Sequence, residues 1–238
     1  MASDDRLYFR QLLSGRDFAA TDTFAQQMRN FAYLIGDRQT GDCLVVDPAY
    51  AAGDLVDALE ADGMHLSGVL VTHHHPDHVG GSMMGFELKG LAELLARISV
   101  PVHVNSHEAM WVSRVTGIPM SDLTAHEHGD RVGVGEVDIE LLHTPGHTPG
   151  SQCFLLDDRL VAGDTLFLEG CGRTDFPGGD ADEMYRSLQR LARLPGDPTV
   201  YPGHWYSAEP SAALSEVRRT NYVFRPTNLE QWRMLMGA

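Results

Sequence analysis

Short apolar segments separated by glycine, proline and polar residues recur along most of the chain. Residues 31–36 (FAYLIG) and 43–48 (CLVVDP) are two such segments, and turn-forming residues bound each of them. Runs of this length and composition are typical of buried strands. The polar segment GDRQTG between them predicts a turn, so we expect a hairpin. Further strands are predicted in 68–75, 100–104, 137–147 (ending in a turn), 152–167 (two strands around Asp157 and Asp158) and 198–205 (with its loop).

A second pattern, with apolar residues three or four positions apart, predicts helices. Residues 53–63 carry Leu55, Val56 and Leu59 at this spacing, and we expect Gly63 to cap the end of the helix. The same spacing in residues 182–194 stops at a proline, which cannot continue a helix. A short helix is predicted at 106–115 and a last one at 211–222.

No linker-like run or simple repeat divides the chain. We therefore expect a single domain over residues 1–238, with a short helical extension from about residue 207. Residues 83–99 form an apolar insertion that suits either a lid or a packing helix. The sequence leaves the oligomeric state open, and apolar Met83, Met84 and Phe86 in this insertion are candidates for a contact patch in a homo-oligomer.

Acidic residues outnumber basic ones: 33 Asp and Glu against 18 Lys and Arg give a formal net charge of -15. Nucleic-acid-binding proteins usually carry a basic surface, so we expect no nucleic-acid partner. No segment reaches the ~20 apolar residues of a membrane helix, and the acidic N-terminus does not resemble a signal peptide. Three widely spaced cysteines fit a reducing compartment. The composition therefore predicts a cytoplasmic protein without a membrane partner.

Residues 72–78, T-H-H-H-P-D-H, follow a predicted buried strand and are rich in metal-binding side chains. Imidazole and carboxylate groups are the usual protein ligands of zinc and non-haem iron. His73 and His75 are two positions apart, so they point to the same side of an extended chain. The proline after them turns the chain and brings Asp77 and His78 in as a second set. A solvated loop or polar helix cap is the alternative, but four ligands in six residues favour a metal site.

Three further motifs place similar side chains directly after predicted strands. In H-T-P-G-H-T-P-G, two Pro-Gly turns fix the backbone around His147, whereas His143 is equally compatible with a core or supporting role. Asp164 in A-G-D-T suits a helix cap or a ligand, and His204 in Y-P-G-H-W would alone be read as a hydrogen-bonded loop histidine. Because all these groups follow strands, they can gather along one edge of a sheet. Seven such ligands without cysteine suit one or two transition metals.

In their order along the chain, the motifs T-H-H-H-P-D-H, T-P-G-H, A-G-D and Y-P-G-H resemble the ligand motifs of the metallo-β-lactamase superfamily over about residues 30–206. The resemblance implies an α+β fold, the αββα sandwich, with two mixed β-sheets flanked by helices. It also implies two divalent metal ions, zinc first, with iron or manganese as alternatives. By comparison with glyoxalase II-like members, the ligands of one metal correspond here to His73, His75 and His147. Those of the other metal correspond to Asp77, His78 and His204, and the bridging carboxylate corresponds to Asp164.

The resemblance to glyoxalase II further implies a metal-dependent hydrolase of the hydroxyacylglutathione hydrolase type. Its substrate would be a small-molecule thioester or ester, with thiol conjugates among the candidates. Two metals would lower the pKa of a bridging water, and the resulting hydroxide would attack the carbonyl. Asp77 would orient this nucleophile as well as bind metal.

An alternative comes from residues 170–176, G-C-G-R-T-D-F, which are similar to the same segment of persulfide dioxygenases. Those enzymes bind a single iron, and their ligands correspond here to His73, His147 and Asp164. We expect the long C-terminal helical domain of glyoxalase II enzymes to be missing or much shortened, so the glutathione contacts that it supplies are not predicted for this chain. A non-enzymatic metal-binding domain is the third possibility.

Substrate-binding residues are predicted around the motifs. Arg173 lies just beyond the expected site and suits recognition of a carboxylate, although a surface ion pair is equally compatible. Tyr206 and Trp205 are expected to line the pocket or to pack beneath it. Cys171 is assigned a packing role, because activated water makes a covalent nucleophile unnecessary.

Overall fold

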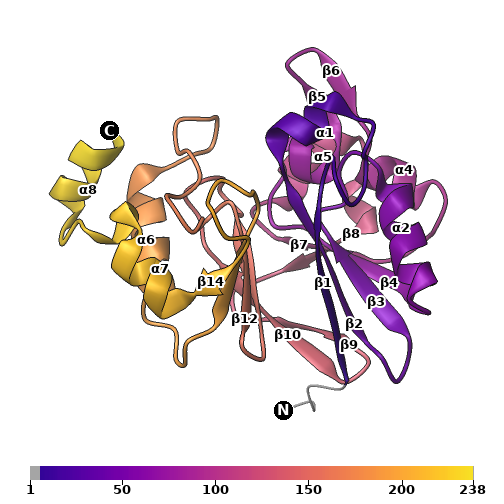
Figure 1. Cartoon of the computed structure of the whole chain (residues 1–238). Coiled ribbons are helices and arrows are strands. Elements are labelled where there is room, and N and C mark those ends of the chain that lie inside the picture. Colours follow the sequence, from indigo (N-terminus) through magenta and orange to yellow (C-terminus); the bar gives the residue numbers. More distant parts are fainter. Residues whose placement is uncertain (1–5, 238) are drawn as a thin grey trace.

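Two six-stranded β-sheets face each other across an apolar core, and helices cover the outer side of each sheet (Figure 1). The structure is a computed structural model and describes residues 6–237. The layers therefore run helix, sheet, sheet, helix. The expected αββα sandwich of two mixed sheets is confirmed.

The first sheet comes from the N-terminal half of the chain. Its strands are β1 (Leu7–Leu13), β2 (Phe31–Asp37), β3 (Asp42–Val46), β4 (His65–Leu70), β7 (Val102–Asn105) and β8 (Leu123–His126). They lie in the order β1-β2-β3-β4-β7-β8. β1, β2 and β3 pair antiparallel, whereas β3, β4, β7 and β8 run parallel. A separate hairpin projects from this half of the molecule and consists of β5 (Gly81–Met83) and β6 (Phe86–Leu88).

The second sheet comes from the C-terminal half. Its strands are β9 (Arg131–Val134), β10 (Val137–His143), β11 (Gln152–Leu156), β12 (Arg159–Gly163), β13 (Thr199–Pro202) and β14 (Ala212–Ala213). Neighbouring strands are antiparallel except for the parallel pair β12 and β13. As a result β10, β12 and β13 point the same way, and their carboxyl ends meet at one edge of the sheet.

Helices close both outer faces (Figure 1). Those of the first half are α1 (Thr23–Met28), α2 (Ala52–Ala61), α3 (Pro76–Val79), α4 (Leu91–Leu95) and α5 (Ala109–Thr116), with the 3-10 turn η1 (Met120–Asp122). Those of the second half are α6 (Ala181–Leu191), α7 (Leu214–Thr220) and α8 (Leu229–Met236), with the 3-10 turn η2 (Tyr222–Phe224). Among residues 6–237, no helix has the length and apolar content needed to cross a membrane.

Strand periodicity explains why the two sheets stack. Side chains alternate along a strand, so Tyr33 and Ile35 of β2 face the other sheet while Leu34 faces the helices. From the second sheet, Ile139 and Phe154 enter the same inter-sheet core. All of these side chains are almost completely buried. Burial on both faces accounts for the continuous apolar runs that the sequence shows in these strands.

Most predicted elements are present, and the differences are local. The hairpin around residues 36–41 is confirmed, and Gly63 follows α2 with a left-handed φ of 77°. The prediction that 211–222 holds the last helix is wrong, because α8 follows it and packs against α6 through the buried Trp232. The 83–99 insertion contains the end of the β5–β6 hairpin and the short helix α4, with Met84 and Phe86 exposed. Its role in self-association stays a prediction, as does the single-domain boundary.

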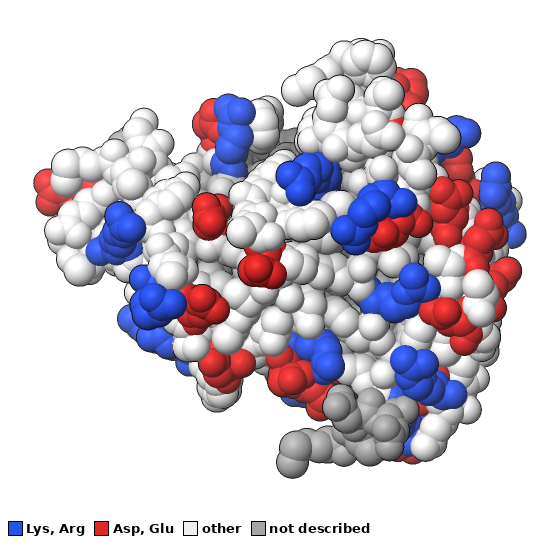
Figure 2. All heavy atoms as spheres, viewed as in Figure 1, with Lys and Arg blue, Asp and Glu red and all other residues white. Residues whose placement is uncertain are grey.

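The surface agrees with the charge expected from composition. On the face drawn in Figure 2, acidic and basic side chains of the described residues are interspersed, without a continuous basic field. The expectation that nucleic acid is not a partner stays a prediction.

The inter-sheet core generates the first testable prediction. Phe154→Ala removes a fully buried ring from the contact between the sheets, and we expect a loss of about 3–5 kcal/mol in the free energy of unfolding. Phe86→Ala is the matched control, because Phe86 is 60% exposed, and it should cost less than about 1 kcal/mol. Urea unfolding of both variants measures the difference. Equal losses would contradict the assignment of the core.

Candidate metal centre

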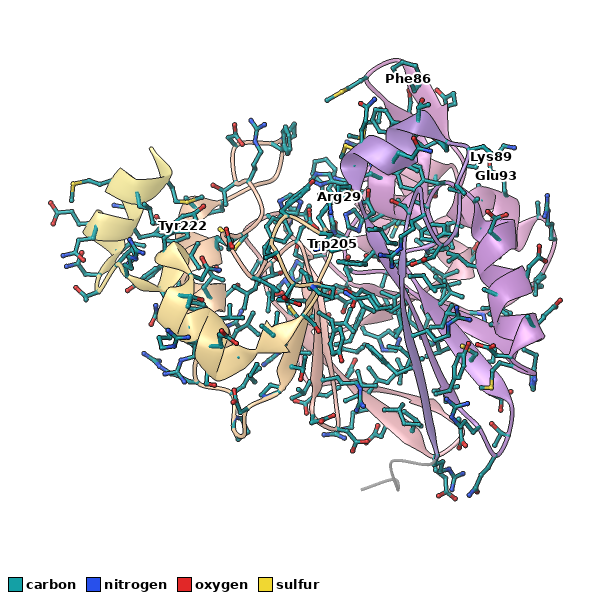
Figure 3. All side chains as sticks on the ribbon, viewed as in Figure 1. Arg29, Phe86, Lys89, Glu93, Trp205 and Tyr222 are labelled. Atoms are coloured by element: carbon teal, nitrogen blue, oxygen red, sulfur yellow. The ribbon has the colours of Figure 1, made fainter. Side chains whose placement is uncertain are left out.

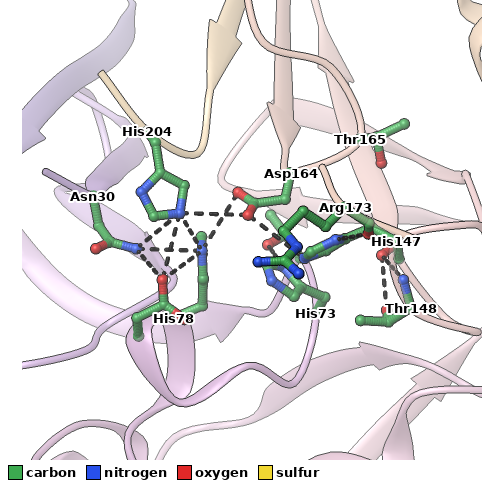
Figure 4. A network of polar contacts seen from close by, with 12 residues as sticks. Asn30, His73, His78, His147, Thr148, Asp164, Thr165, Arg173 and His204 are labelled. Carbon is green, nitrogen blue, oxygen red and sulfur yellow. Dashed lines mark hydrogen bonds and ion pairs between the residues drawn. The ribbon is translucent and has the colours of Figure 1, made fainter. Parts of the chain in front are cut away.

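The predicted ligand motifs meet at one edge of the sandwich. Residues 72–78 follow β4 and include the first three residues of α3. Residues 144–150 follow β10, Asp164 follows β12 and His204 follows β13. The two sheets are joined at this edge by an isolated antiparallel bridge between Asn30 and His204. Side chains that are far apart in sequence therefore lie together in one buried cluster (Figure 4).

His73, His75 and His147 form what we name the first ligand group. One ring nitrogen from each lies within 4.8 Å of those of the other two. The ring centroids of His73 and His75 are 4.8 Å apart, and those of His75 and His147 are 4.5 Å apart. The distance between the rings of His73 and His75 confirms the prediction that these two side chains point to the same side.

Asp77, His78 and His204 form the second ligand group, with their ligand atoms also within 4.8 Å of one another. Asp77 and His78 lie on the single turn of α3, which the proline at its first position begins. The Nε2 atoms of His78 and His204 are 3.3 Å apart, and Asp77 Oδ2 is 3.4 Å from His204 Nε2. All three side chains are buried.

Asp164 lies between the two groups. Its Oδ2 is 3.5 Å from His147 Nε2 on one side and 3.4 Å from His204 Nε2 on the other, while Oδ1 is 3.5 Å from His78 Nε2. A Cβ on Gly203 would lie 2.2 Å from Asp164 Oδ1, so the close approach of this backbone requires glycine. The carboxylate thus has the position that a bridging ligand needs.

Hydrogen bonds from the outer ring nitrogens orient the imidazoles. Nδ1 of His147 donates to the carbonyl of Arg173 at 2.7 Å, and Nδ1 of His204 donates to the carbonyl of Met28 at 2.9 Å. Nδ1 of His78 donates to Asp47 at 2.9 Å. Each bond leaves Nε2 facing the centre of the cluster. This arrangement of an acceptor behind each imidazole is typical of metal-ligating histidines.

The electrostatics of the cluster favour positive charge between the carboxylates. Burial opposes charge on His78, yet Asp164, Asp77 and Asp47 outweigh it and raise the pKa of His78 to about 10. Burial also opposes ionisation of Asp164, but His204, His78 and His147 hold the pKa of its carboxyl well below the usual range. At His73, by contrast, burial and the surrounding imidazoles lower the pKa, so this ring is neutral and able to accept a cation.

Unpartnered atoms at the centre test whether the residues fit a metal. Nε2 of His73, Nε2 of His147 and Oδ1 of Asp164 are buried, and none has a hydrogen-bond partner among the described residues. Buried polar atoms of this kind are rare unless a ligand or ion satisfies them. Imidazole and carboxylate donors are the set that zinc, iron and manganese bind. The residues therefore fit a divalent metal site.

Not every predicted residue joins the cluster. His143 stacks on His107 with centroids 5.1 Å apart and bonds the carbonyl of Pro149, outside both ligand groups. This arrangement corresponds to the supporting alternative for His143. Cys171 packs against the core beneath the second sheet, where burial raises the pKa of its thiol to about 12.

Two predicted substrate residues border the cluster. Tyr206 stacks on His204 with centroids 4.7 Å apart and is half exposed. Arg173 lies over the ring of Phe176, which contacts His75, but its guanidinium forms an ion pair with Asp175 at 2.6 Å. The contribution of Arg173 that the structure shows is its carbonyl, which orients His147. Binding of substrate by Arg173 and Tyr206 stays a prediction.

Sequence reasoning missed several residues around the cluster. Asn30 donates to Asp77 and accepts from Tyr50, and Asp47 binds both His78 and Thr72. The V-D-P end of β3 is a signal that could have found Asp47, because Asp164 has the same place after a strand. Asn30 precedes β2 without any such motif.

Arg29 is a further residue that the sequence did not single out. Its guanidinium lies 4.7 Å from the ring centroid of Trp205, which follows His204 (Figure 3). Its charge acts on Tyr206, where it offsets part of the rise in the pKa of the phenol. No carboxylate pairs with Arg29 among the residues that the structure describes. Among the described residues, the charge of Arg29 is therefore not neutralised by a carboxylate, and Arg29 directly precedes Asn30, which donates to Asp77 of the second ligand group.

Comparison with known proteins agrees with this geometry. The family model of the metallo-beta-lactamase superfamily matches residues 27–204, so the chain belongs to this superfamily. It is a metal-dependent enzyme of that family by its fold and its histidine and aspartate clusters.

The names of individual relatives describe different activities. The chain is 34% identical over 205 residues to the probable polyketide biosynthesis zinc-dependent hydrolase BaeB of Bacillus velezensis, covering 85% of each protein. It is 42% identical over 181 residues to a hydroxyacylglutathione hydrolase of Bradyrhizobium, covering 75% of this chain and 64% of that protein. It is 30% identical over 216 residues to the human mitochondrial persulfide dioxygenase ETHE1, covering 87% and 76%. The chain thus spans less than two thirds of that hydroxyacylglutathione hydrolase.

A solved structure shows the same fold. The crystal structure of ETHE1 from Myxococcus xanthus superimposes with a TM-score of 0.77 at 30% identity, covering 97% of this chain and 90% of that one.

The ligand groups generate a prediction about metal content. We expect two metal ions per chain in protein purified without chelator. His147→Ala should lower this content by removing a donor from the first ligand group, whereas His143→Ala should leave it unchanged. Elemental analysis of the two variants and the original protein makes the measurement. Unchanged metal content in His147→Ala would show that this histidine is not a ligand.

Proposed function

We propose that the protein is a dinuclear metal-dependent thioesterase of the glyoxalase II type, which hydrolyses thioester or ester bonds of a small molecule. The observation that carries the proposal is the place of Asp164 between the two ligand groups, at 3.4–3.5 Å from His147 and His204. A carboxylate in this position suits a pair of metals better than a single one. When bound, such metals activate water as a nucleophile near neutral pH and polarise the substrate carbonyl.

The residues of this chain would prepare that chemistry in distinct ways. His73, His75 and His147 would hold one metal, Asp77, His78 and His204 the other, and Asp164 would contact both. Asp77 Oδ2 is 3.0 Å from the amide nitrogen of Asn30, so one carboxylate oxygen is fixed while the side chain faces the cluster. This fixed orientation supports a role for Asp77 in aligning the attacking water.

Nothing in this scheme needs a protein nucleophile. Cys171 is the cysteine closest in sequence to the ligand Asp164, and burial raises the pKa of its thiol to about 12. It would remain protonated near neutral pH and is a weak nucleophile in that form. Its place in the apolar core supports the assigned packing role.

Thioester hydrolysis under controlled oxygen tests the proposed function. We expect S-lactoylglutathione or a simple acyl thioester to be cleaved equally with and without oxygen. Removal of metal by a chelator should lower the rate by about 100-fold or more, and zinc should restore it. Release of thiol measures the reaction. Intact thioesters in the presence of two bound metals would rule this activity out.

A second activity is supported by His73, His147 and Asp164, which form a set of two imidazoles and one carboxylate around shared space. This set is typical of mononuclear iron oxygenases. Together with the G-C-G-R-T-D-F segment and the similarity to a persulfide dioxygenase, it supports iron-dependent oxidation of a persulfide as the alternative. One iron per chain and oxygen uptake with glutathione persulfide would favour it over hydrolysis.

Substrate charge gives a prediction about the arginines. If the thiol part of the substrate carries a carboxylate, Arg29→Gln should lower kcat/KM for a glutathione thioester by roughly 10-fold, mainly through KM. Arg173→Gln should have a smaller effect, because that guanidinium is already shared with Asp175. The N-acetylcysteamine thioester of the same acyl group lacks the carboxylate and serves as the control. Equal losses on both thioesters would exclude recognition of the carboxylate by Arg29.

A further inference from the structure

One buried carboxylate outside both ligand groups connects two of the ligand-bearing loops. Glu108 lies at the start of α5 and is 1% exposed. Its Oε1 accepts the backbone N–H of His74 at 2.8 Å and Nδ1–H of the same residue at 2.5 Å. Its Oε2 accepts the backbone N–H of Gly150 at 2.6 Å. Three donors from two loops thus converge on a single side chain.

The two loops are those that supply the first ligand group. His74 lies between the ligand candidates His73 and His75, and Gly150 is three residues after His147. His74 lies in the loop after β4 of the first sheet, and Gly150 lies in the loop between β10 and β11 of the second. Because both oxygens of Glu108 are used, the carboxylate fixes the distance between the loops. It therefore acts on the relative position of all three imidazoles without contacting a metal.

The surroundings keep Glu108 itself in place. Its backbone N–H donates to the carbonyl of Asn105 at 2.9 Å, and its carbonyl accepts from the first turn of α5. A Cβ on Gly150 would lie 2.5 Å from the nitrogen of Glu108, so the loop approaches as closely as glycine permits. On the other side, His74 stacks on Trp111 with centroids 4.9 Å apart.

This arrangement also explains the middle histidine of the H-H-H run. His74 belongs to neither ligand group, and its Nδ1 is occupied by Glu108. Its side chain faces α5, whereas His73 and His75 face His147. His74 is therefore an anchor for the loop rather than a third ligand in the run.

We propose that Glu108 is a positioning residue that sets the metal affinity of the first ligand group by clamping the 72–78 loop to the 144–150 loop. The inference rests on the proposed metal centre. The metal affinity of the second ligand group should not depend on Glu108. Its members Asp77, His78 and His204 are oriented by Asn30, Asp47 and Met28, respectively.

Glu108→Gln is the sharpest test, because it keeps the size of the side chain but replaces one acceptor oxygen by an –NH2 donor and removes the charge. All three partners of Glu108 are N–H groups, so at least one of them must face the amide –NH2 of glutamine, whichever way it is turned. We expect a loss of 10–100-fold in affinity at the first ligand group and little change at the second. Competition with a chromophoric chelator and the visible spectrum of the Co²⁺-substituted protein measure the two sites separately.

Asp37→Asn provides a matched control. Asp37 is also a buried carboxylate with three donors, from Arg6, Gln39 and Glu136. It lies at the opposite end of β2 from Asn30, about 20 Å away at the rise of a strand. Its replacement should lower stability while leaving both metal affinities unchanged. An equal loss of affinity in Asp37→Asn would mean that metal binding only follows stability, and would overturn the inference.

Variants of His74 keep the inference testable if Glu108→Gln fails to fold. Asn carries an amide nitrogen near the place of Nδ1, so His74→Asn should retain the bond to Glu108 and near-normal affinity. His74→Leu removes that donor and should show the same selective loss as Glu108→Gln. Equal affinities in His74→Leu and the original protein would overturn the clamp. Absence of metal in the original protein would overturn the metal centre and the clamp together, whereas two metals with unchanged affinities in Glu108→Gln would overturn the clamp alone.

Discussion

Three buried carboxylates, Asp47, Asp77 and Asp164, lie around the same imidazoles at one edge of the sandwich. Negative charge in such a place is costly unless positive charge accompanies it. These carboxylates raise the pKa of His78 against the effect of its burial, so they favour positive charge at this place. A divalent cation would compensate the same negative charge and would also bind the unpartnered nitrogens of His73 and His147. The chemistry of the site follows from this electrostatic requirement.

The fold meets that requirement by aligning strand ends. β10, β12 and β13 run the same way in one sheet, so the residues that follow them reach one edge. β4 brings the 72–78 loop to that edge from the other sheet. The core between the sheets holds these ends at a constant distance, and hydrogen bonds behind His78, His147 and His204 set the rotation of those rings. Precision at the site therefore comes from backbone carbonyls and supporting carboxylates as much as from the ligands themselves.

The ligand candidates could be predicted from the sequence more readily than the residues that orient them by hydrogen bonds. Histidines and aspartates placed directly after apolar strands are visible as local motifs, and the residues predicted as ligands do gather at one place. Asn30 and Glu108 carry no local motif, since the side chains and loops that they bind are at least 20 residues away in the sequence. Asp47 follows a strand as Asp164 does, but its role depends on His78, 31 residues away. The ion pair of Arg173 with Asp175, two residues away, corresponds to the alternative that the sequence left open for this arginine. In the fold, strong periodic elements were predictable, whereas β1, β9 and α8 were missed because their stability depends on packing against distant elements.

The bridge between Asn30 and His204 has a consequence for how the molecule is assembled. Each ligand group draws on both halves of the chain, so a bound ion ties one sheet to the other. Neither half can present a complete set of donors before the sheets have docked, so full coordination of an ion requires the docked sandwich. An ion bound in this way would stabilise the docked halves. Its contribution to the free energy of unfolding would grow with the logarithm of the free metal concentration. Metal supply would in this way govern the stability of the fold as well as the activity.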